Sequence, residues 1–373
     1  MKAHNTVDGI QIAGLMIAYT TGSSIVFIPN PISEAAGNVS WLSTLLSFSF
    51  GLIVLFCTLY LYRVHQGQDL ITYSRMLLGR FVSCLVAITV AGLLLFALPA
   101  VVAGIGDFLS NVMMTETPVY VFNSLSFFTI ALTARAGLKD MARAFVLLVF
   151  IMLVIALLIL LLALPLYKPA FFLPFLPDGI RPVLHGTFLS SGFPFGEIFL
   201  FAMIYPFFRP DKRSFSTKPM YIAYCISGTL LFLCVLCTSL TFGPATGYYK
   251  YSLYSLASEI HVAELLQRIE AIVGIALIIG SYMKASIFLF MLNQVVIKLL
   301  KIKDEAALIY PITLVSLFLS LTLFKDPSDF NDQIYVLWPF AIIFVGCSLI
   351  VLLAIISWFR IRLRTPAQGR DKA

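Results

Sequence analysis

Uninterrupted apolar runs constrain this chain more than any other feature of its sequence. One run, LLVFIMLVIALLILLLAL (Leu147–Leu164), has no charged residue and is long enough to cross a bilayer as a helix. Similar runs recur along the 373 residues, which are 60% hydrophobic and only 12% charged. A soluble domain of this size cannot solvate such a surface. We therefore expect an all-α integral membrane protein.

Charged loops and Pro/Gly-rich breaks divide the chain into ten predicted transmembrane helices. Their approximate bounds are 9–28, 40–62, 80–106, 117–133, 143–166, 186–208, 219–243, 268–299, 306–324 and 334–359. Ten crossings place both termini on one side of the membrane. No separate soluble domain fits between the spans, so residues 1–373 are expected to form a single transmembrane domain.

Lys and Arg residues are distributed very unevenly between the two sides. Of the 25, 19 fall on the side of the termini, five fall in the opposite loops, and Lys284 lies inside a span. The positive-inside rule therefore predicts cytoplasmic termini. Contact with lipids explains the net charge of +7, because the basic tail, residues 360–373, can bind anionic membrane lipids. We expect no nucleic-acid partner.

Two predicted spans are interrupted by residues that disfavour a continuous helix. The first span contains YTTGSSIVFIP, and the sixth contains SSGFPFGE, Ser190 to Glu197. They open two halves of five helices, about 9–166 and 186–359. Since five is odd, the halves enter the membrane from opposite sides, which predicts a 5+5 inverted repeat. Interrupted helices at corresponding positions point to a transporter-like binding site.

Unwinding a helix in the membrane frees backbone donors and acceptors, which must face a cavity or a ligand. Freed N–H groups attract an anion and freed carbonyls attract a cation, so two breaks match a zwitterion such as an amino acid. The candidates for the carboxylate are Gly22, Ser23 and Ser24. The candidate carbonyls for the ammonium are those around Tyr19, Thr20, Leu189 and Ser190. Alternatively, the Gly and Ser residues of the first span mark close helix packing.

Two charged residues are predicted well inside the membrane, Glu197 and Lys284. Each costs roughly 2.5–3.5 kcal/mol on insertion scales, so each should face the interior with a partner. Glu197 begins the second half of the sixth helix, where a carboxylate either stabilises the helix N-terminus or handles a ligand ammonium or a proton. Lys284 either acts in the interior or extends to the cytoplasmic interface.

Other polar features of the sequence have simpler interpretations. The acids near the outer span ends are expected to be rim charges: Asp107, Glu116, Glu264 and Glu270. Segment 69–80 is expected to form a short amphipathic helix on the cytoplasmic face. The Tyr-rich segment 248–268 is expected to form another one outside, either as part of the interfacial aromatic belt or as a lid.

No motif for catalysis, a cofactor or a metal is found in the sequence. The four histidines lie at span ends or in loops, and no glycine-rich phosphate loop or nucleophile motif is present. The six cysteines all fall in predicted spans, where they serve as small apolar side chains. We therefore expect no enzymatic activity, no cofactor and no metal ion.

The predicted architecture resembles the amino acid–polyamine–organocation superfamily, whose LeuT-type fold has broken helices 1 and 6. Within it, four stretches resemble the B subunits of GerA-type spore germinant receptors. These stretches are DGIQIAGLMIAYTTGSSIVFIP, LITYSRMLLGR, FPFGEIFLFAMIYPF and RIEAIVGIALIIGSYMKASIF. The resemblance spans nearly the whole chain.

The resemblance implies a subunit in the inner spore membrane of an endospore former, with A and C subunits as partners. It implies a nutrient ligand, usually an amino acid or sugar. Carried over by position, the ligand site adds Gly192, Phe193, Pro194 and Glu197 to the serines of helix 1, with Phe193 and Phe195 shaping a side-chain pocket. In this fold helix 8 packs beside the break of helix 1, so Lys284 would replace the sodium that many such transporters bind.

Three functions remain open at this stage. The first is a receptor subunit that senses a nutrient and signals through partner proteins. The second is a secondary transporter that moves an amino acid with a proton. The third is a path for water or ions that a ligand opens. All three share one fold, so the fold alone does not distinguish them.

Overall fold

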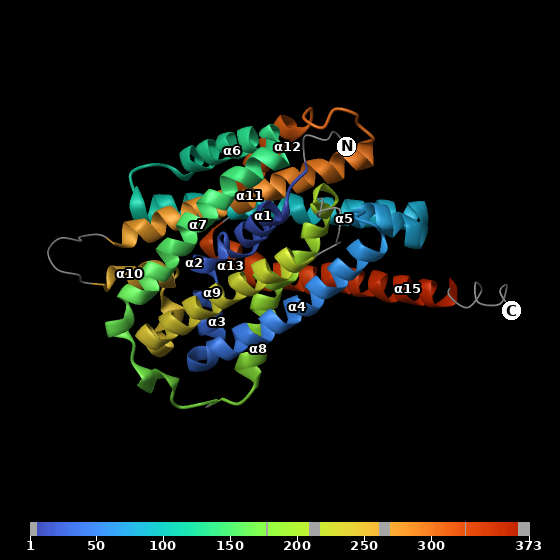
Figure 1. Ribbon diagram of the computed structural model, residues 1–373. Coiled ribbons are helices and arrows are strands. Elements are labelled where there is room, and N and C mark those ends of the chain that lie inside the picture. The colour runs from blue at the N-terminus through green and yellow to red at the C-terminus, as the bar shows by residue number, and fades with distance from the viewer. Residues whose placement is uncertain (1–5, 177, 209–216, 261–268, 325, 365–373) are drawn as a thin grey trace.

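The computed structural model describes residues 6–364 of the chain, except 177, 209–216, 261–268 and 325. These residues are almost entirely helical, with one isolated β-bridge between Val7 and Phe208. Helix α1 begins and α15 ends toward the same end of the bundle, whereas α10 lies at the opposite end (Figure 1). This placement agrees with an even number of crossings.

The helices follow the apolar runs of the sequence. The first half of the chain contains α1 (Gly9–Thr21), α2 (Ser24–Phe27), α3 (Pro29–Ala36), α4 (Ser40–Val64), α5 (Leu70–Phe108), α6 (Val119–Ala136) and α7 (Leu138–Leu162). The second half contains α8 (Arg181–Ser190), α9 (Lys218–Phe242), α10 (Ser252–Ser258), α11 (Glu270–Leu300), α12 (Ile309–Thr322), α13 (Pro327–Asp332), α14 (Trp338–Phe340) and α15 (Ser348–Arg364).

Eight helical stretches among the described residues are long and apolar enough to cross a membrane. Two expected spans are not among these eight stretches, and each is excluded by its structure. Span 186–208 is broken, and the helix in span 306–324, Ile309–Thr322, has only 14 residues. The structure thus confirms the all-α membrane class but not the count of ten. The division into repeats at 9–166 and 186–359 stays a prediction.

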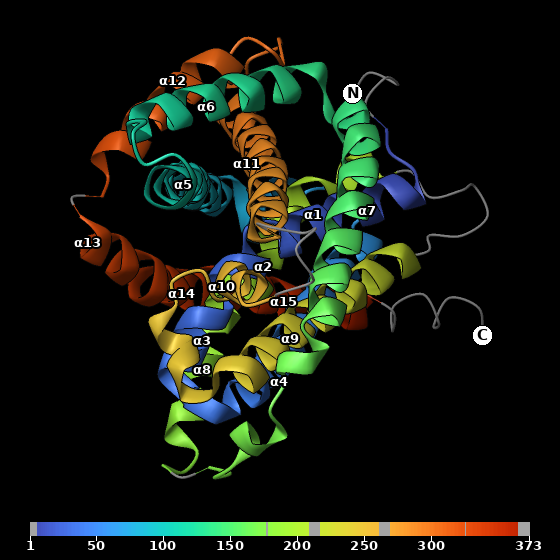
Figure 2. The ribbon, with the colours of Figure 1, turned by 90° about the vertical axis from the view of Figure 1, so that its left-hand side faces the viewer.

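Two helices form the centre of the bundle. In the most apolar 18 residues of Gly9–Phe27, 83% of the residues are buried, and the corresponding share in Glu270–Leu300 is 78%. In Leu138–Leu162 it is only 33%. A helix that is apolar on all sides and buried on all sides is a core helix. Helix α11 packs along α5, as the end-on view shows, and α1 packs against α7, α9 and α11 (Figure 2). The outer helices leave apolar side chains for lipid.

The amphipathic segment 69–80 forms the first part of α5. Asp69 caps its N-terminus, accepting hydrogen bonds from the backbone N–H groups of Ile71 and Thr72. A kink at Gly79 (φ 85°, ψ 178°) separates this part from the membrane span, because the left-handed φ suits glycine. The predicted outer helix is shorter than expected, since α10 covers only Ser252–Ser258. Residues 261–268, including Glu264, lie outside the described part of the chain.

Candidate functional site

The first helix breaks where its sequence predicts. Helix α1 ends at Thr21, Gly22 leaves the helical conformation (φ −16°, ψ −98°), and α2 starts at Ser24. A Cβ atom on Gly22 would lie 2.7 Å from the carbonyl oxygens of Ala18 and Gly280. The glycine therefore allows the backbones of α1 and α11 to touch at the break.

The sixth helix breaks at Ser191–Phe195, between α8 and a 3₁₀ segment over Gly196–Met203. Phe193 has an extended backbone (φ −140°, ψ 119°) inside this stretch. A Cβ atom on Gly192 would lie 2.2 Å from the Cα of Pro339, so the last membrane span packs directly on the break. The Gly-Phe-Pro-Phe-Gly composition thus interrupts the helix and also admits its neighbour.

Glu197 and Lys284 pair with each other. Nζ of Lys284 lies 2.7 Å from Oε2 of Glu197, and the two side chains are 0% and 2% exposed, respectively. Lys284 therefore acts in the interior and does not extend to the cytoplasmic interface. Each charge supplies the partner that burial requires, because an unpaired charge in this environment is strongly unfavourable. The pair joins α11 to the segment that follows the Ser191–Phe195 break.

Two further side chains position Glu197. Nε1 of Trp338 donates a hydrogen bond to Oε1 of Glu197 at 2.8 Å, so both carboxylate oxygens are engaged. The hydroxyl of Tyr19 donates to the backbone carbonyl of Glu197 at 2.9 Å. Residues from α1, α11 and α14 therefore converge on the first turn after the break.

Aromatic rings surround the Lys284 ammonium. Nζ lies 4.1 Å from the ring centroid of Phe193, 5.5 Å from that of Phe288 and 5.6 Å from that of Tyr19. A cation held within about 6 Å of ring faces gains favourable electrostatic energy, which increases when water is absent. The rings thus hold the cation beside the breaks of both helices.

A cavity of about 50 Å³ adjoins the ion pair. This volume holds a few water molecules but is far below the roughly 300–1,000 Å³ of typical ligand pockets. Small and aromatic side chains dominate its wall. The lining residues are Ser23, Phe27, Phe96, Ala97, Ala100, Val101, Gly104, Phe193, Glu197, Phe288, Phe330, Ile334, Tyr335 and Trp338.

The structure brings Ser23, Phe193 and Glu197 of the predicted site to this cavity. The hydroxyls of Ser23 and Ser24 are buried without a hydrogen-bond partner among the described residues, as is that of Ser281 on α11. These polar groups beside the break have unused hydrogen-bonding capacity, which is uncommon for buried hydroxyls.

Other predicted site residues make structural contacts away from the cavity. Thr20 donates to the hydroxyl of Ser227 at 2.7 Å, and Ser190 bonds to Ser47. Phe195 packs edge-on against Phe48 and Tyr224. Pro194 is buried within the break. Gly22 and Gly192 form the backbone crossings described above.

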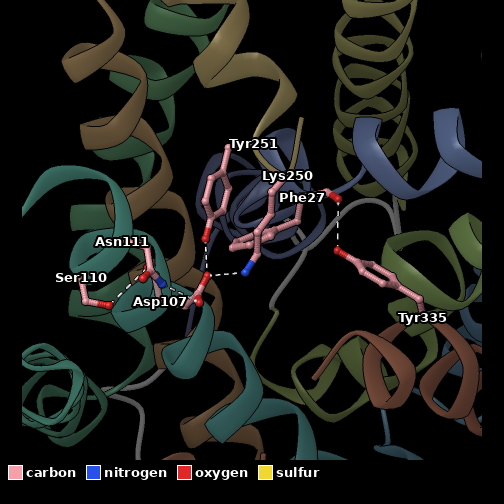
Figure 3. Close-up of polar contacts among 7 residues, drawn as sticks. All are labelled: Phe27, Asp107, Ser110, Asn111, Lys250, Tyr251 and Tyr335. Atoms are coloured by element: carbon pink, nitrogen blue, oxygen red, sulfur yellow. Dashed lines mark hydrogen bonds and ion pairs between the residues drawn. The ribbon is translucent and has the colours of Figure 1, made fainter. Parts of the chain in front are cut away.

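The loop that precedes α10 is tied to the C-terminal end of α5 (Figure 3). Nζ of Lys250 lies 2.7 Å from Oδ2 of Asp107, and the Tyr251 hydroxyl donates to the same oxygen. The Tyr251 ring packs edge-on against Phe27, whose carbonyl accepts a 3.5 Å hydrogen bond from Tyr335. Asp107 is therefore more than a rim charge, because it fastens the loop over a wall of the cavity.

A second set of contacts joins helices at the end of the bundle where α5 begins. Lys298 of α11 pairs with Asp69, and the backbone N–H of Val7 donates to the carbonyl of Phe207 at 2.9 Å. Burial alone raises the pKa of Asp69, but Lys298 and the hydrogen bonds from Thr72 outweigh it and hold the pKa below its usual value. The carboxylate therefore stays charged at neutral pH and holds α5 to α11.

Trp338, Ser281 and the Asp107–Lys250 pair are absent from the sequence-based prediction. Trp338 had no distinctive signal, since it lies near the start of the predicted span 334–359, where tryptophan is usual. The other contacts join residues far apart in sequence, and no local pattern marks them.

Comparison with solved structures supports the fold. The chain is similar to MhsT in complex with L-phenylalanine, with a TM-score of 0.64, 12% identity and coverage of 94% of this chain and 87% of that one. It is also similar to MHP1, a nucleobase-cation-symport-1 family transporter in a closed conformation with bromovinylhydantoin bound. There the TM-score is 0.63 at 13% identity, covering 88% and 74% of the two chains. These likenesses confirm the LeuT-type transporter fold.

Sequence comparison is more specific. The chain is 27% identical over 371 residues to Spore germination protein KB of Bacillus subtilis (strain 168), covering 97% of each protein. The model of a family described as spore germination protein matches residues 6–329. Taken with the broken helices and the buried pair, this match shows that the chain belongs to the spore germination protein family of integral membrane proteins.

Proposed function

We propose that this chain is the nutrient-sensing B subunit of a spore germinant receptor. In this proposal it lies in the inner spore membrane with both termini on the spore-core side, and it signals to A and C subunits. Its ligand is a small zwitterion, such as an amino acid, held at mid-membrane between the breaks of helices 1 and 6.

One observation carries the proposal: a cavity between the two breaks adjoins the buried Glu197–Lys284 pair. Two buried charges inside a membrane protein mark a functional site by default, since a purely structural core avoids their desolvation cost. The same fold in MhsT was solved in complex with an amino acid, L-phenylalanine. The B. subtilis relative is named for spore germination.

The free polar groups suggest how the ligand lies. In this proposal Gly22 and the unpartnered hydroxyls of Ser23 and Ser24 receive its carboxylate. Glu197, which lines the cavity, receives its ammonium, and the carbonyls around Tyr19, Thr20, Leu189 and Ser190 join it once the cavity walls have moved. The ring of Phe193 and the small residues of α5 favour an apolar ligand side chain. Gly192, Pro194 and Phe195 hold the shape of the break rather than touching the ligand.

Lys284 serves as a tethered cation in this proposal. Lys284 leaves α11 at its crossing with α1, where a Cβ on Gly22 would come within 3.0 Å of the Lys284 Cβ, and its ammonium lies 5.6 Å from the ring centroid of Tyr19 on α1. A fixed charge beside the break takes the place of a bound sodium ion. Ligand binding should therefore be independent of sodium, and sodium-dependent binding by the wild-type chain would contradict this role.

Two alternatives keep the same site. The transporter relatives favour a permease that moves the amino acid with a proton, with the ion pair as the proton-handling group. The small cavity at mid-membrane favours a path for water or ions that ligand binding opens. Both predict flux across the membrane, whereas a sensor binds without flux.

The test uses the purified chain in proteoliposomes with a panel of radiolabelled amino acids. Gly104→Leu should abolish binding, since Gly104 lines the cavity, whereas Gly92→Leu on the same helix meets nothing within 4 Å of its added Cβ and should bind normally. Binding without counterflow supports a sensor. Saturable counterflow identifies a permease, and unchanged binding by Gly104→Leu excludes this cavity as the ligand site.

A further inference from the structure

A second and much larger cavity lies apart from the membrane centre. Its volume is about 590 Å³, within the range of pockets that hold small organic ligands. Three separate segments contribute to it: residues 33–39 at the end of α3 and just after it, Pro174, Asp178, Gly179 and Pro182 before and at the start of α8, and Pro244, Gly247 and Tyr248 after α9. All three lie in loops predicted to face the outside.

Specific contacts hold the walls of this outer cavity. Nδ2 of Asn30 donates to the carbonyl of Gly247 at 2.7 Å, and Nδ2 of Asn38 donates to that of Leu173 at 3.1 Å. A Cβ atom on Gly247 would lie 2.8 Å from the Cα of Glu34, so the two backbones touch there. The cavity is therefore a built feature of the fold and not a gap between unrelated loops.

The lining of the outer cavity offers acceptors and negative charge. It includes the carboxylates of Glu34 and Asp178, and its described residues include no Lys, Arg or His. Ser33 also lines it, and its side chain is 2% exposed with a hydroxyl that has no hydrogen-bond partner within the described ranges. Oδ1 of Asn38 is likewise buried and unpartnered there. Buried polar atoms usually have partners, so these two indicate a missing ligand.

We propose that the outer cavity binds an organic cation that carries a primary ammonium group. Such a group has three N–H donors and a positive charge, for which two carboxylates, a hydroxyl and an amide oxygen offer acceptors and compensating negative charge. A metal ion fits less well. Calcium takes six to eight oxygen ligands at about 2.3–2.6 Å, and the described residues contain no cluster of three or more His, Cys, Asp or Glu side chains. The volume also far exceeds that of one ion.

This inference is independent of the mid-membrane site. The probe is 1,5-diaminopentane, titrated by calorimetry into the full chain in lipid nanodiscs at low salt. The double variant Glu34→Gln/Asp178→Asn should weaken binding at least about tenfold, the scale of a lost charge-assisted hydrogen bond. Glu116→Gln removes an exposed acid outside the cavity and should leave the affinity unchanged.

Ser33→Ala separates a binding role from a structural one. Because this hydroxyl has no hydrogen-bond partner among the residues that the structure describes, its loss should leave the thermal unfolding temperature unchanged while weakening diamine binding several-fold. The permethylated diamine, which lacks N–H donors at its quaternary ends, should also bind more weakly.

Three results would overturn the proposal. One is equal diamine affinity in the wild type and the folded double variant. Another is saturable binding of calcium without binding of the diamine, which would indicate a metal site. The third is diamine binding that survives the double variant but is lost in Gly104→Leu, which would locate the diamine at mid-membrane.

Discussion

Two ion pairs of the same length lie in very different surroundings, one at the loop before α10 and one in the centre of the bundle. Nζ–Oδ2 of Lys250–Asp107 and Nζ–Oε2 of Lys284–Glu197 both measure 2.7 Å. The first pair has side chains 41% and 27% exposed, and the second has side chains 0% and 2% exposed. Distance therefore says little about what each pair contributes, because the surroundings determine the electrostatic energy.

The difference assigns different roles to the two pairs. Water solvates and screens the Lys250–Asp107 pair, so it opens at small cost. The Lys284–Glu197 pair cannot separate without leaving a charge in an apolar environment. The molecule thus combines a fixed charge pair at its centre with a fastening at the outer loop that opens easily.

The largest expected effect comes from removing one member of the buried pair. Lys284→Met should lower the free energy of unfolding by about 3–5 kcal/mol, because Glu197 then remains buried and unpaired. Thermal unfolding in detergent micelles, followed by near-UV circular dichroism, measures the loss. The double variant Glu197→Met/Lys284→Met should recover most of it, and a double variant as unstable as the single ones would contradict this account.

Trp338→Phe tests how the carboxylate is oriented. This change removes the 2.8 Å hydrogen bond to Glu197. It keeps an aromatic ring that can stack on Phe96, whose ring centroid lies 5.4 Å from that of Trp338 in the wild type. Loss of a hydrogen bond to a charged group should cost about 1.5–3 kcal/mol. The same unfolding assay applies. In the Glu197→Met/Lys284→Met background the cost of Trp338→Phe should shrink, and an undiminished cost would mean that the tryptophan acts through packing alone.

Gly22→Ala tests the crossing of α1 and α11. The new methyl group would lie 2.7 Å from two carbonyl oxygens, so the helices must separate at a cost of about 1–3 kcal/mol. Gly92→Ala is the matched control, since its Cβ meets no atom within 4 Å and alanine favours a helix. Equal unfolding temperatures for the two variants would argue against a tight crossing.

The smallest effect on stability is expected for the exposed pair. Lys250→Met should change the free energy of unfolding by less than about 1 kcal/mol. Hydrogen exchange of peptides covering Tyr248–Ser258 should nevertheless become faster, because the loop loses its link to Asp107. High salt should have the same effect on the wild type. Lys303→Met serves as an exposed-lysine control, and slow exchange in both variants would show that Tyr251 alone holds the loop.

Local composition was sufficient to predict the breaks. Gly22 and the Gly192–Gly196 stretch interrupt helices whatever surrounds them, since glycine and proline act through the backbone of their own segment. The amphipathic start of α5 was predictable for the same reason. The count of ten stays a prediction, because the broken span 186–208 and the short helix Ile309–Thr322 are not among the eight described stretches that are long and apolar enough to cross a membrane.

Pairing between spans could not be predicted in the same way. Glu197 and Lys284 were each expected to have an interior partner, but nothing in their neighbourhoods identifies one with the other. Trp338 depends on the packing of the last span against the break of helix 6, which is a tertiary property. Asp107 looked like an ordinary rim charge because its partner, Lys250, lies in a loop far along the chain.

The size of the central cavity has a kinetic consequence. At about 50 Å³ it is too small for a ligand with several heavy atoms, so the walls must move before one can enter. Association then includes a conformational step, and its observed rate should level off as ligand concentration rises. If the ligand binds here as proposed, the affinity measured at equilibrium is reduced by the fraction of molecules that are open. A sensor of the proposed kind would then respond to sustained exposure rather than to brief encounters.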